Sequence, residues 1–283
     1  MRFFFVLFIL GLLAAGCGTG TTTNRDVKHL SPEAIQKKLL GNWLVFKVGT
    51  RNATEEQAAL LQDTLSRLKD IFELNTFIVS PGKVVVEDSL GRWQQRTWEL
   101  LPPDIIGFKE EENVFEIVTL SDSILTLSSR IDYKKAHADI MLACYRIKTE
   151  GYGDQGLAAT ALSRWRTKPA KPETPAAIAG RVVSLLQYDG IYLEALNNSG
   201  ADYFNTRRFQ LPFSYYNGGV MLKPFDSSSR FAGLFFNAGD ARTAHGLLKE
   251  YFEASPYPEE DNYMLAYSAF MKNLAAAIQK GNP

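Results

Sequence analysis

A series of short β-forming runs between residues 76 and 148 constrains the fold more than any other feature of this sequence. Turn-forming residues such as Pro81-Gly82 and Ser121-Asp122 separate the runs. They cover residues 76–80, 83–87, 92–100, 104–109, 114–120, 123–129 and 136–148. With an earlier run at 41–46 they make eight strands. Eight strands joined by tight turns suit an up-and-down β-barrel that is either filled by side chains or holds one small ligand.

Two helical patterns accompany these strands. Ser31-Pro32-Glu33 is typical of a helix start, with Ser as N-cap and Pro at the first helical position. A second helix, predicted over 54–72, begins with a capping box and is inserted between the first two strands. Its apolar face carries Leu61, Leu65, Leu68 and Phe72. This helix either packs on an outer face of the barrel, which we favour, or lies over the barrel mouth as a lid.

The first strand opens with Gly41-Asn42-Trp43, which resembles the Gly-x-Trp signature of the lipocalins. The resemblance implies a lipocalin-like β-barrel over residues 31–149. In that family the Trp closes one end of the barrel and packs under a basic residue from a late strand. Arg146 is the first candidate for that partner and Arg130 the second.

Aromatic residues are frequent in the predicted strands. If the barrel is open inside, it binds a small apolar or amphipathic ligand; if it is closed, these rings fill the core. The candidate ligand-binding residues are Phe77, Trp93, Trp98, Phe108 and Phe115. The Val84-Val85-Val86 run has apolar residues on both faces, so one face is expected to pack on the inserted helix or on a second domain.

A change of composition marks a boundary between residues 150 and 172, which is Gly-rich and then Pro-rich. Within it, Ser163-Arg164-Trp165-Arg166 is bulky, and we expect it to dock against a domain surface. Residues 173–283 then form a small α+β domain with helices on one face of an antiparallel sheet.

In this second domain we expect a helix over 174–197, a β-hairpin of 209–216 and 220–225 around Asn217-Gly218, and a third strand over 230–237. Two helices follow, from Asp240 and from Asp261. Around the hairpin, three aromatic residues form either a partner-recognition patch or the core of the sheet. They are Phe213, Tyr215 and Tyr216.

The N-terminus has the layout of a secretory signal: Met1-Arg2, an apolar run over 3–13, and Ala14-Ala15-Gly16 before Cys17. A short transmembrane anchor is the alternative, but 11 apolar residues fall short of the roughly 20 that span a bilayer. The segment resembles the lipobox of bacterial lipoproteins. That resemblance implies a signal peptide over 1–16, lipid on Cys17 and a flexible tether over 17–30. Because no acidic run follows Cys17, it also favours an outer-membrane protein that faces the periplasm.

Charge and cysteine content narrow the partners. Lys+Arg and Asp+Glu both number 31, so the formal net charge is zero and nucleic acid is not an expected partner. With Cys17 committed to lipid, Cys144 has no disulfide partner and is expected to be a small buried hydrophobe.

Motifs for chemistry are lacking. His29, His137 and His245 show no metal-ligand spacing, and there is no nucleophile elbow or phosphate-binding glycine loop. We therefore predict no catalytic residue, no metal and no cofactor. The main hypothesis is a non-enzymatic, membrane-tethered lipoprotein that binds a small ligand in its barrel. The alternatives are a closed-barrel accessory lipoprotein that acts through envelope protein partners, and an envelope hydrolase with an unrecognised site.

Overall fold

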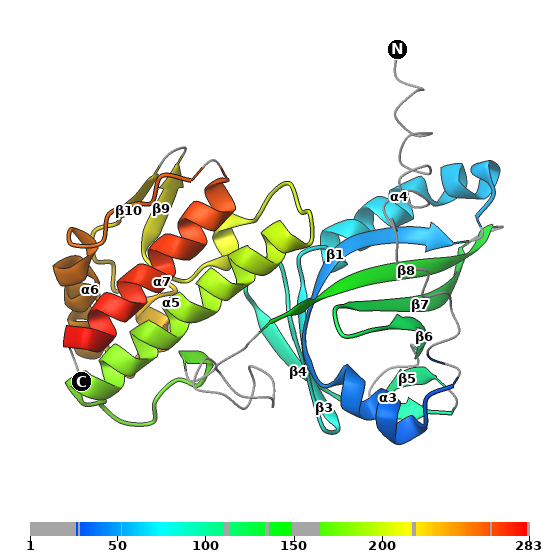
Figure 1. Cartoon of the computed structure of the whole chain (residues 1–283), viewed down its shortest axis with the longest axis horizontal. Helices are drawn as coiled ribbons and strands as arrows, with labels where there is room; N and C mark the ends of the chain where they lie inside the picture. The colour runs from blue at the N-terminus through cyan, green and yellow to red at the C-terminus, as the bar shows by residue number, and fades with distance from the viewer. Residues whose placement is uncertain are drawn as a thin grey trace, which may run out of the picture.

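The computed structural model describes residues 27, 29–51, 53–102, 104–109, 114–133, 136–148, 165–216, 219–260 and 262–281, except for the side chains of 131–133, 136 and 137. The predicted signal peptide, Cys17 and most of the predicted tether lie outside the described residues. Figure 1 shows a β-barrel beside a mainly helical second domain.

Eight strands form a closed antiparallel barrel in which each pairs with its neighbours in sequence, and the last pairs with the first. The lipocalin-like up-and-down barrel is therefore confirmed. The strands are β1 (Gly41–Arg51), β2 (Thr76–Ser80), β3 (Lys83–Glu87), β4 (Trp93–Leu101), β5 (Ile105–Phe108), β6 (Val114–Leu120), β7 (Ile124–Tyr133) and β8 (Ala136–Ile147).

Strand β3 is covered on both faces, by the barrel core on one side and by the second domain on the other. Successive side chains point to opposite faces of a strand. Val84 and Val86 pack into the barrel core, whereas Val85 packs against the core of the second domain. A strand that is covered on both faces reads as a continuous apolar run, as predicted for these valines.

One end of the barrel is closed by Trp43, which is fully buried. Its indole Nε1 donates to the Leu39 carbonyl (2.8 Å) at the end of α3 (Pro32–Leu39). The guanidinium carbon of Arg146 lies 4.1 Å from the centre of the Trp43 ring, and Arg146 donates to the Leu40 carbonyl (2.8 Å). The structure thus places Arg146, the first of the two candidates, against the tryptophan.

Gly41 is required at this closed end for two reasons. Its φ of +128° is a backbone conformation that L side chains rarely adopt, and a Cβ there would lie 2.6 Å from Arg146 Nη1. The Gly-x-Trp motif therefore places the backbone, the indole and the guanidinium in one compact layer.

The inserted helix α4 (Glu55–Phe72) begins with the predicted capping box at Thr54 and packs along β1 and β8. Its Leu61 is fully buried and packs with Ala53 and Ala138. The outer-face position that we favoured is therefore correct for most of the helix, although its last turn reaches the cavity described below.

The second domain is built around α5 (Pro175–Asn198). Most residues of α5 are buried, because the helix packs against α7 (Tyr263–Gly281) on one side and against β1 and β8 on another. The other elements are α6 (Ala238–Phe252) and a hairpin of β9 (Phe213–Tyr216) and β10 (Gly219–Leu222). The docking predicted for the linker is confirmed for Trp165, whose side chain is buried. The centroid of its ring lies 5.4 Å from that of the Tyr188 ring.

The prediction of a third strand over 230–237 is wrong. That segment holds a 3₁₀ turn, η4 (Ala232–Leu234), started by a hydrogen bond from the Ala232 N–H to the Ser229 hydroxyl (3.2 Å). Phe231 and Phe235, four residues apart, are both buried in the domain core. Phe231 and Phe235 are the residues that flank the turn, and the Phe235 N–H donates to the Ala232 carbonyl within the turn instead of to a neighbouring strand. The α+β domain therefore has a two-stranded sheet.

We expect Trp43→Ala to lower the free energy of unfolding by about 3–5 kcal/mol, since it removes a fully buried large aromatic. Denaturant unfolding measures this change. Trp93→Ala is the matched control, because Trp93 is 48% exposed, and we expect it to cost less than about 1 kcal/mol. Equal effects of the two substitutions would contradict the role of Trp43 in closing the barrel.

Candidate ligand-binding cavity

The interior of the barrel holds a cavity of about 510 Å³. Leu39, beside Trp43, lines its closed end, and the β3–β4 turn and the last turn of α4 line the other end. Ile71 on α4 is 55% exposed, so the cavity meets solvent there. Its walls are mainly apolar, and the wall residues from β2, β3 and β5–β8 are Phe77, Val79, Val84, Val86, Ile106, Phe108, Phe115, Leu125, Leu127 and Leu142.

The structure places four of the five predicted ligand-binding residues around this cavity, namely Phe77, Trp98, Phe108 and Phe115. Trp93 does not line it. Arg92 and Gln94, the residues on either side of Trp93, line the cavity, so the tryptophan points to the opposite face of β4 and is 48% exposed. Because side chains alternate between the two faces of a strand, Trp93 and Trp98, five residues apart, are expected on opposite faces of β4. Trp93 was predicted to bind ligand only because it is aromatic.

Strand β4 also gives the cavity its polar side, which the sequence analysis missed. Gln94 and Arg96 on β4, and Arg92 just before the strand, all line the cavity and are spaced two residues apart. Arg96 Nη2 donates to Gln94 Oε1 (2.8 Å), and Arg92 Nε donates to Asp88 Oδ2 (2.7 Å). The cavity therefore has apolar walls and one polar strand, which is an arrangement for an amphipathic occupant.

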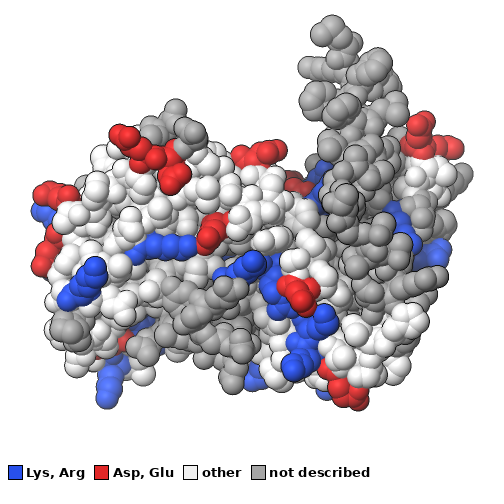
Figure 2. Space-filling view, in the orientation of Figure 1, with Lys and Arg blue, Asp and Glu red and all other residues white. Residues whose placement is uncertain are grey.

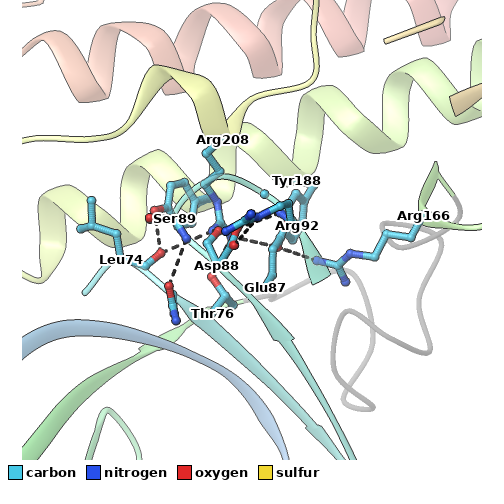
Figure 3. Close-up of polar contacts among 12 residues, drawn as sticks. Leu74, Thr76, Glu87, Asp88, Ser89, Arg92, Arg166, Tyr188 and Arg208 are labelled. Carbon is cyan, nitrogen blue, oxygen red and sulfur yellow. Dashed lines mark hydrogen bonds and ion pairs between the residues drawn. The ribbon is translucent and has the colours of Figure 1, made fainter. Parts of the chain in front are cut away.

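The last residue of β3, Glu87, ties the barrel to the second domain at this end (Figure 3). Its carboxylate is buried and forms ion pairs with Arg208 and Arg166, each at 2.8 Å between Nη2 and Oε2. Tyr188 donates its hydroxyl to the same oxygen. Burial alone would raise the pKa of Glu87, but the two guanidinium groups and the Tyr188 hydrogen bond hold it below its ordinary value.

Arg208 extends this link to the backbone of the barrel. It donates to the Asp88 carbonyl (2.8 Å) and to Thr76 Oγ1 (2.8 Å), and its guanidinium carbon lies 3.8 Å from the centre of the Tyr192 ring. The Tyr192 hydroxyl donates to the Leu74 carbonyl (3.1 Å). One arginine and one tyrosine therefore hold both the β3–β4 turn and the connection into β2.

A second arginine of the same domain holds the β3–β4 turn from outside. Arg230 donates to the Leu90 carbonyl (2.8 Å) and to the Gly91 carbonyl (3.3 Å). Gly91 has a φ of +69°, and a Cβ there would lie 2.4 Å from the Arg208 carbonyl oxygen. Because Asp88, Ser89 and Leu90 line the cavity, the second domain fixes part of its mouth.

Asp189, on α5, is a second buried carboxyl in this region. Its pKa is raised well above the ordinary value, mainly by burial, and its Oδ2 has no hydrogen-bond partner among the described residues. The pKa values of Asp189 and Glu87 therefore shift in opposite directions, since Arg208 and Arg166 form ion pairs with Glu87.

The three residues predicted as a partner-recognition patch do not form one. Phe213 is buried (2% exposed) and Tyr215 is largely buried, and both pack in an aromatic cluster that includes Phe209. Tyr216 follows Tyr215 on the strand, points to the other face and is 54% exposed. The alternative, that these rings build the core, is right for the first two.

Cys144 and His245, two of the residues that could carry chemistry, are placed in structural roles, whereas the side chain of His137 lies outside the described residues. Cys144 is fully buried, and burial raises its pKa, so its thiol is unreactive. The His245 ring nitrogen Nε2 lies 2.8 Å from the Lys223 carbonyl. Within the part of the chain that the structure describes, no three His, Cys, Asp or Glu side chains gather into a metal site, and no helix is both long and apolar enough to span a bilayer.

No protein-family model matches the sequence, and no curated protein matches it significantly. Among solved structures, the chain is similar to the siderocalin Ex-FABP, with 11% sequence identity and a TM-score of 0.28. The match covers 68% of this chain and 97% of that one, whose description states that it functions through dual ligand specificities. The lipocalin-like fold of the present chain is established by its own closed eight-strand register.

We expect Glu87→Gln to destabilise the protein by about 3–5 kcal/mol, since it leaves two buried guanidinium groups without their counter-charge. Because the pKa of Glu87 is lowered on folding, its contribution is complete above the ordinary value of 4.5 and is lost as the pH falls below that value. Denaturant unfolding at several pH values between 3 and 7 measures both effects.

The matched control is Glu99→Gln, since the Glu99 side chain is 49% exposed and lies 3.9 Å from Lys109. We expect this control to change stability by less than about 1 kcal/mol. If Glu87→Gln kept the acid-range slope of the wild type, the assignment of that slope to Glu87 would be wrong.

Proposed function

We propose that this protein binds a small amphipathic molecule inside its barrel and acts as a non-enzymatic binding protein. The observation that carries the proposal is the cavity of about 510 Å³, which lies within the roughly 300–1,000 Å³ range of small-molecule sites. A closed barrel, the premise of the accessory-protein alternative, would have its interior filled by side chains.

The distribution of polarity supports an amphipathic occupant over a purely apolar one. Leu125, Leu127 and Leu142 line the side of the cavity formed by β7 and β8, and Gln94 and Arg96 line the side formed by β4. An apolar body against the leucines leaves the polar groups of β4 for a polar end of the ligand. Transfer of apolar surface from water supplies the binding energy, at about 25 cal/mol per Å².

We further propose that the protein is tethered to the outer membrane through lipid on Cys17 and faces the periplasm. The support is the sequence alone: a signal-like segment over 1–16 that ends on a cysteine, followed by a polar stretch over 18–28 without an acidic run. A tethered binding protein of this kind would exchange its ligand at the membrane surface or pass it to an envelope protein.

Cys17→Ser should move the protein from the membrane fraction to the soluble fraction or leave it unprocessed, since no thiol remains for lipid attachment. Cell fractionation with immunoblotting measures the change. Cys144→Ser is the control and should leave fractionation unaltered. A Cys17→Ser protein that is processed and still sediments with membranes would contradict the tether.

Ligand binding is tested with N-phenyl-1-naphthylamine, a neutral fluorescent probe of apolar cavities. We expect Val86→Trp, which places an indole in the cavity, to weaken probe binding at least about tenfold, because it occupies the volume that the probe needs. Val114→Trp is the matched control, since Val114 is 44% exposed and does not line the cavity. Equal binding by the two variants would place the probe elsewhere.

Native mass spectrometry of the protein purified from its own host identifies the natural ligand. A stoichiometric amphipathic adduct that is absent from Val86→Trp would support the proposal. An adduct that is present in both variants, Val86→Trp and Val114→Trp, would contradict binding in the barrel.

A further inference from the structure

A second concave site lies in the second domain, next to the barrel. It is a cleft of about 780 Å³ that neither the lipocalin-like fold nor the ligand proposal accounts for. The β3–β4 turn contributes Leu90 and Arg92 to it, so this turn separates the cleft from the barrel cavity. The rest of the lining comes from the segments around η3 (Thr206–Arg208), β9 and η4, from the chain after β10, and from His245 on α6.

The floor of the cleft is aromatic. Phe209, Phe213 and Phe231 line it and are themselves almost fully buried, so their positions are fixed by the domain core. Phe225 completes the floor and packs edge-on against the His245 ring, with 5.7 Å between the ring centroids. A rigid aromatic floor binds flat apolar groups at a small cost in conformational entropy.

The rim of the cleft is cationic. Arg207, Lys223 and Arg230 line it, and among the described residues that line it Asp226 is the one carboxylate. Arg92, which also lines it, is paired with Asp88. On the face seen in Figure 2, acidic and basic side chains are mixed, in keeping with a net charge of zero for the whole chain. The excess of positive charge in the cleft is therefore local.

Asp226 does not neutralise this excess. Its Oδ1 accepts hydrogen bonds from the Ser228 N–H (2.8 Å) and hydroxyl (2.7 Å), and no ion pair joins it to a basic residue among those the structure describes. Within the same residues, Arg207, Lys223 and Arg230 form no ion pair either.

Hydrogen bonds to backbone carbonyls hold the guanidinium of Arg230 in place without cancelling its charge. Arg230 Nη1 donates to the Leu90 (2.8 Å) and Arg207 (2.6 Å) carbonyls, which are neutral acceptors. His245 contacts the Lys223 carbonyl and fixes the backbone from which that lysine projects. A guanidinium held in this way loses little freedom when an anion binds near it.

We propose that this cleft is a second binding site, distinct from the barrel cavity, for an organic anion with an aromatic or other flat apolar body. The body lies on the phenylalanine floor, and a phosphate or carboxylate group binds Arg207 and Lys223. Arg207 supplies a planar guanidinium that suits such oxyanions, and Lys223 supplies a point charge.

The test uses isothermal titration calorimetry on the full-length protein at low salt, with 1-naphthyl phosphate as the probe. Two further probes separate the contributions: 1-naphthol has the ring without the charge, and inorganic phosphate has the charge without the ring. We expect naphthyl phosphate to bind at least about tenfold more tightly than either, since a charged hydrogen bond or a buried ring is each worth more than 1.4 kcal/mol.

The variant Arg207→Gln/Lys223→Gln should weaken binding of naphthyl phosphate at least about tenfold, while Arg207→Lys/Lys223→Arg, which keeps both charges, should retain binding within about threefold. Both residues are exposed, so the fold does not depend on their charges. The matched control is Arg67→Gln/Lys69→Gln, which removes two exposed charges from α4 and should leave affinity unaltered.

Three results would overturn the proposal. The first is the absence of naphthyl phosphate binding to the wild type. The second is an equal affinity in the cleft variant and the α4 control, which would place the anion elsewhere, the barrel included. The third is 1-naphthol or inorganic phosphate binding as tightly as naphthyl phosphate, since the ring or the charge would then contribute nothing.

Discussion

The buried carboxylate of Glu87 is the constraint on which the arrangement of the two halves depends. A carboxylate taken out of water costs several kcal/mol unless cations and hydrogen-bond donors surround it. The barrel does not supply the cations: Arg166 and Arg208 come from the linker and the second domain, and Tyr188 comes from α5. The end of β3 is therefore stable in its observed environment only while the second domain is docked.

This dependence reaches the candidate ligand site through the backbone. The β3–β4 turn and the connection into β2 line the cavity mouth, and Arg208, Arg230 and Tyr192 hold them by hydrogen bonds to carbonyl groups. The same turn forms a wall of the cationic cleft. A shift of the second domain would thus change the shape of both cavities, even though that domain does not enclose the barrel.

The sequence predicts the barrel well because its determinants are local. Alternating apolar residues, tight turns and the Gly41-x-Trp43 opening each act over a few residues, and so does the capping box of α4. The closing contact between Trp43 and Arg146 was reached only by resemblance, since the two residues are distant in sequence.

The features that the sequence does not predict depend on contacts between residues that are far apart in the chain. Glu87 and Arg208 are 121 residues apart, and each looks like an ordinary surface charge in its local sequence. The prediction of a strand over 230–237 is wrong because this segment forms a 3₁₀ turn, and Phe231 and Phe235 on either side of the turn are buried in the domain core. Whether a barrel interior is filled or hollow depends on how side chains from all eight strands meet, which no single run of residues reveals.

The most direct test of the link between the two halves is differential scanning calorimetry of the full-length protein. If Glu87 and its partners join the barrel and the second domain into one cooperative unit, unfolding gives a single transition whose calorimetric and van't Hoff enthalpies agree. A substitution in either core, Trp43→Ala in the barrel or Phe270→Ala in the second domain, then lowers that one transition temperature. Two separate transitions, each responding to only one of these substitutions, would contradict the account.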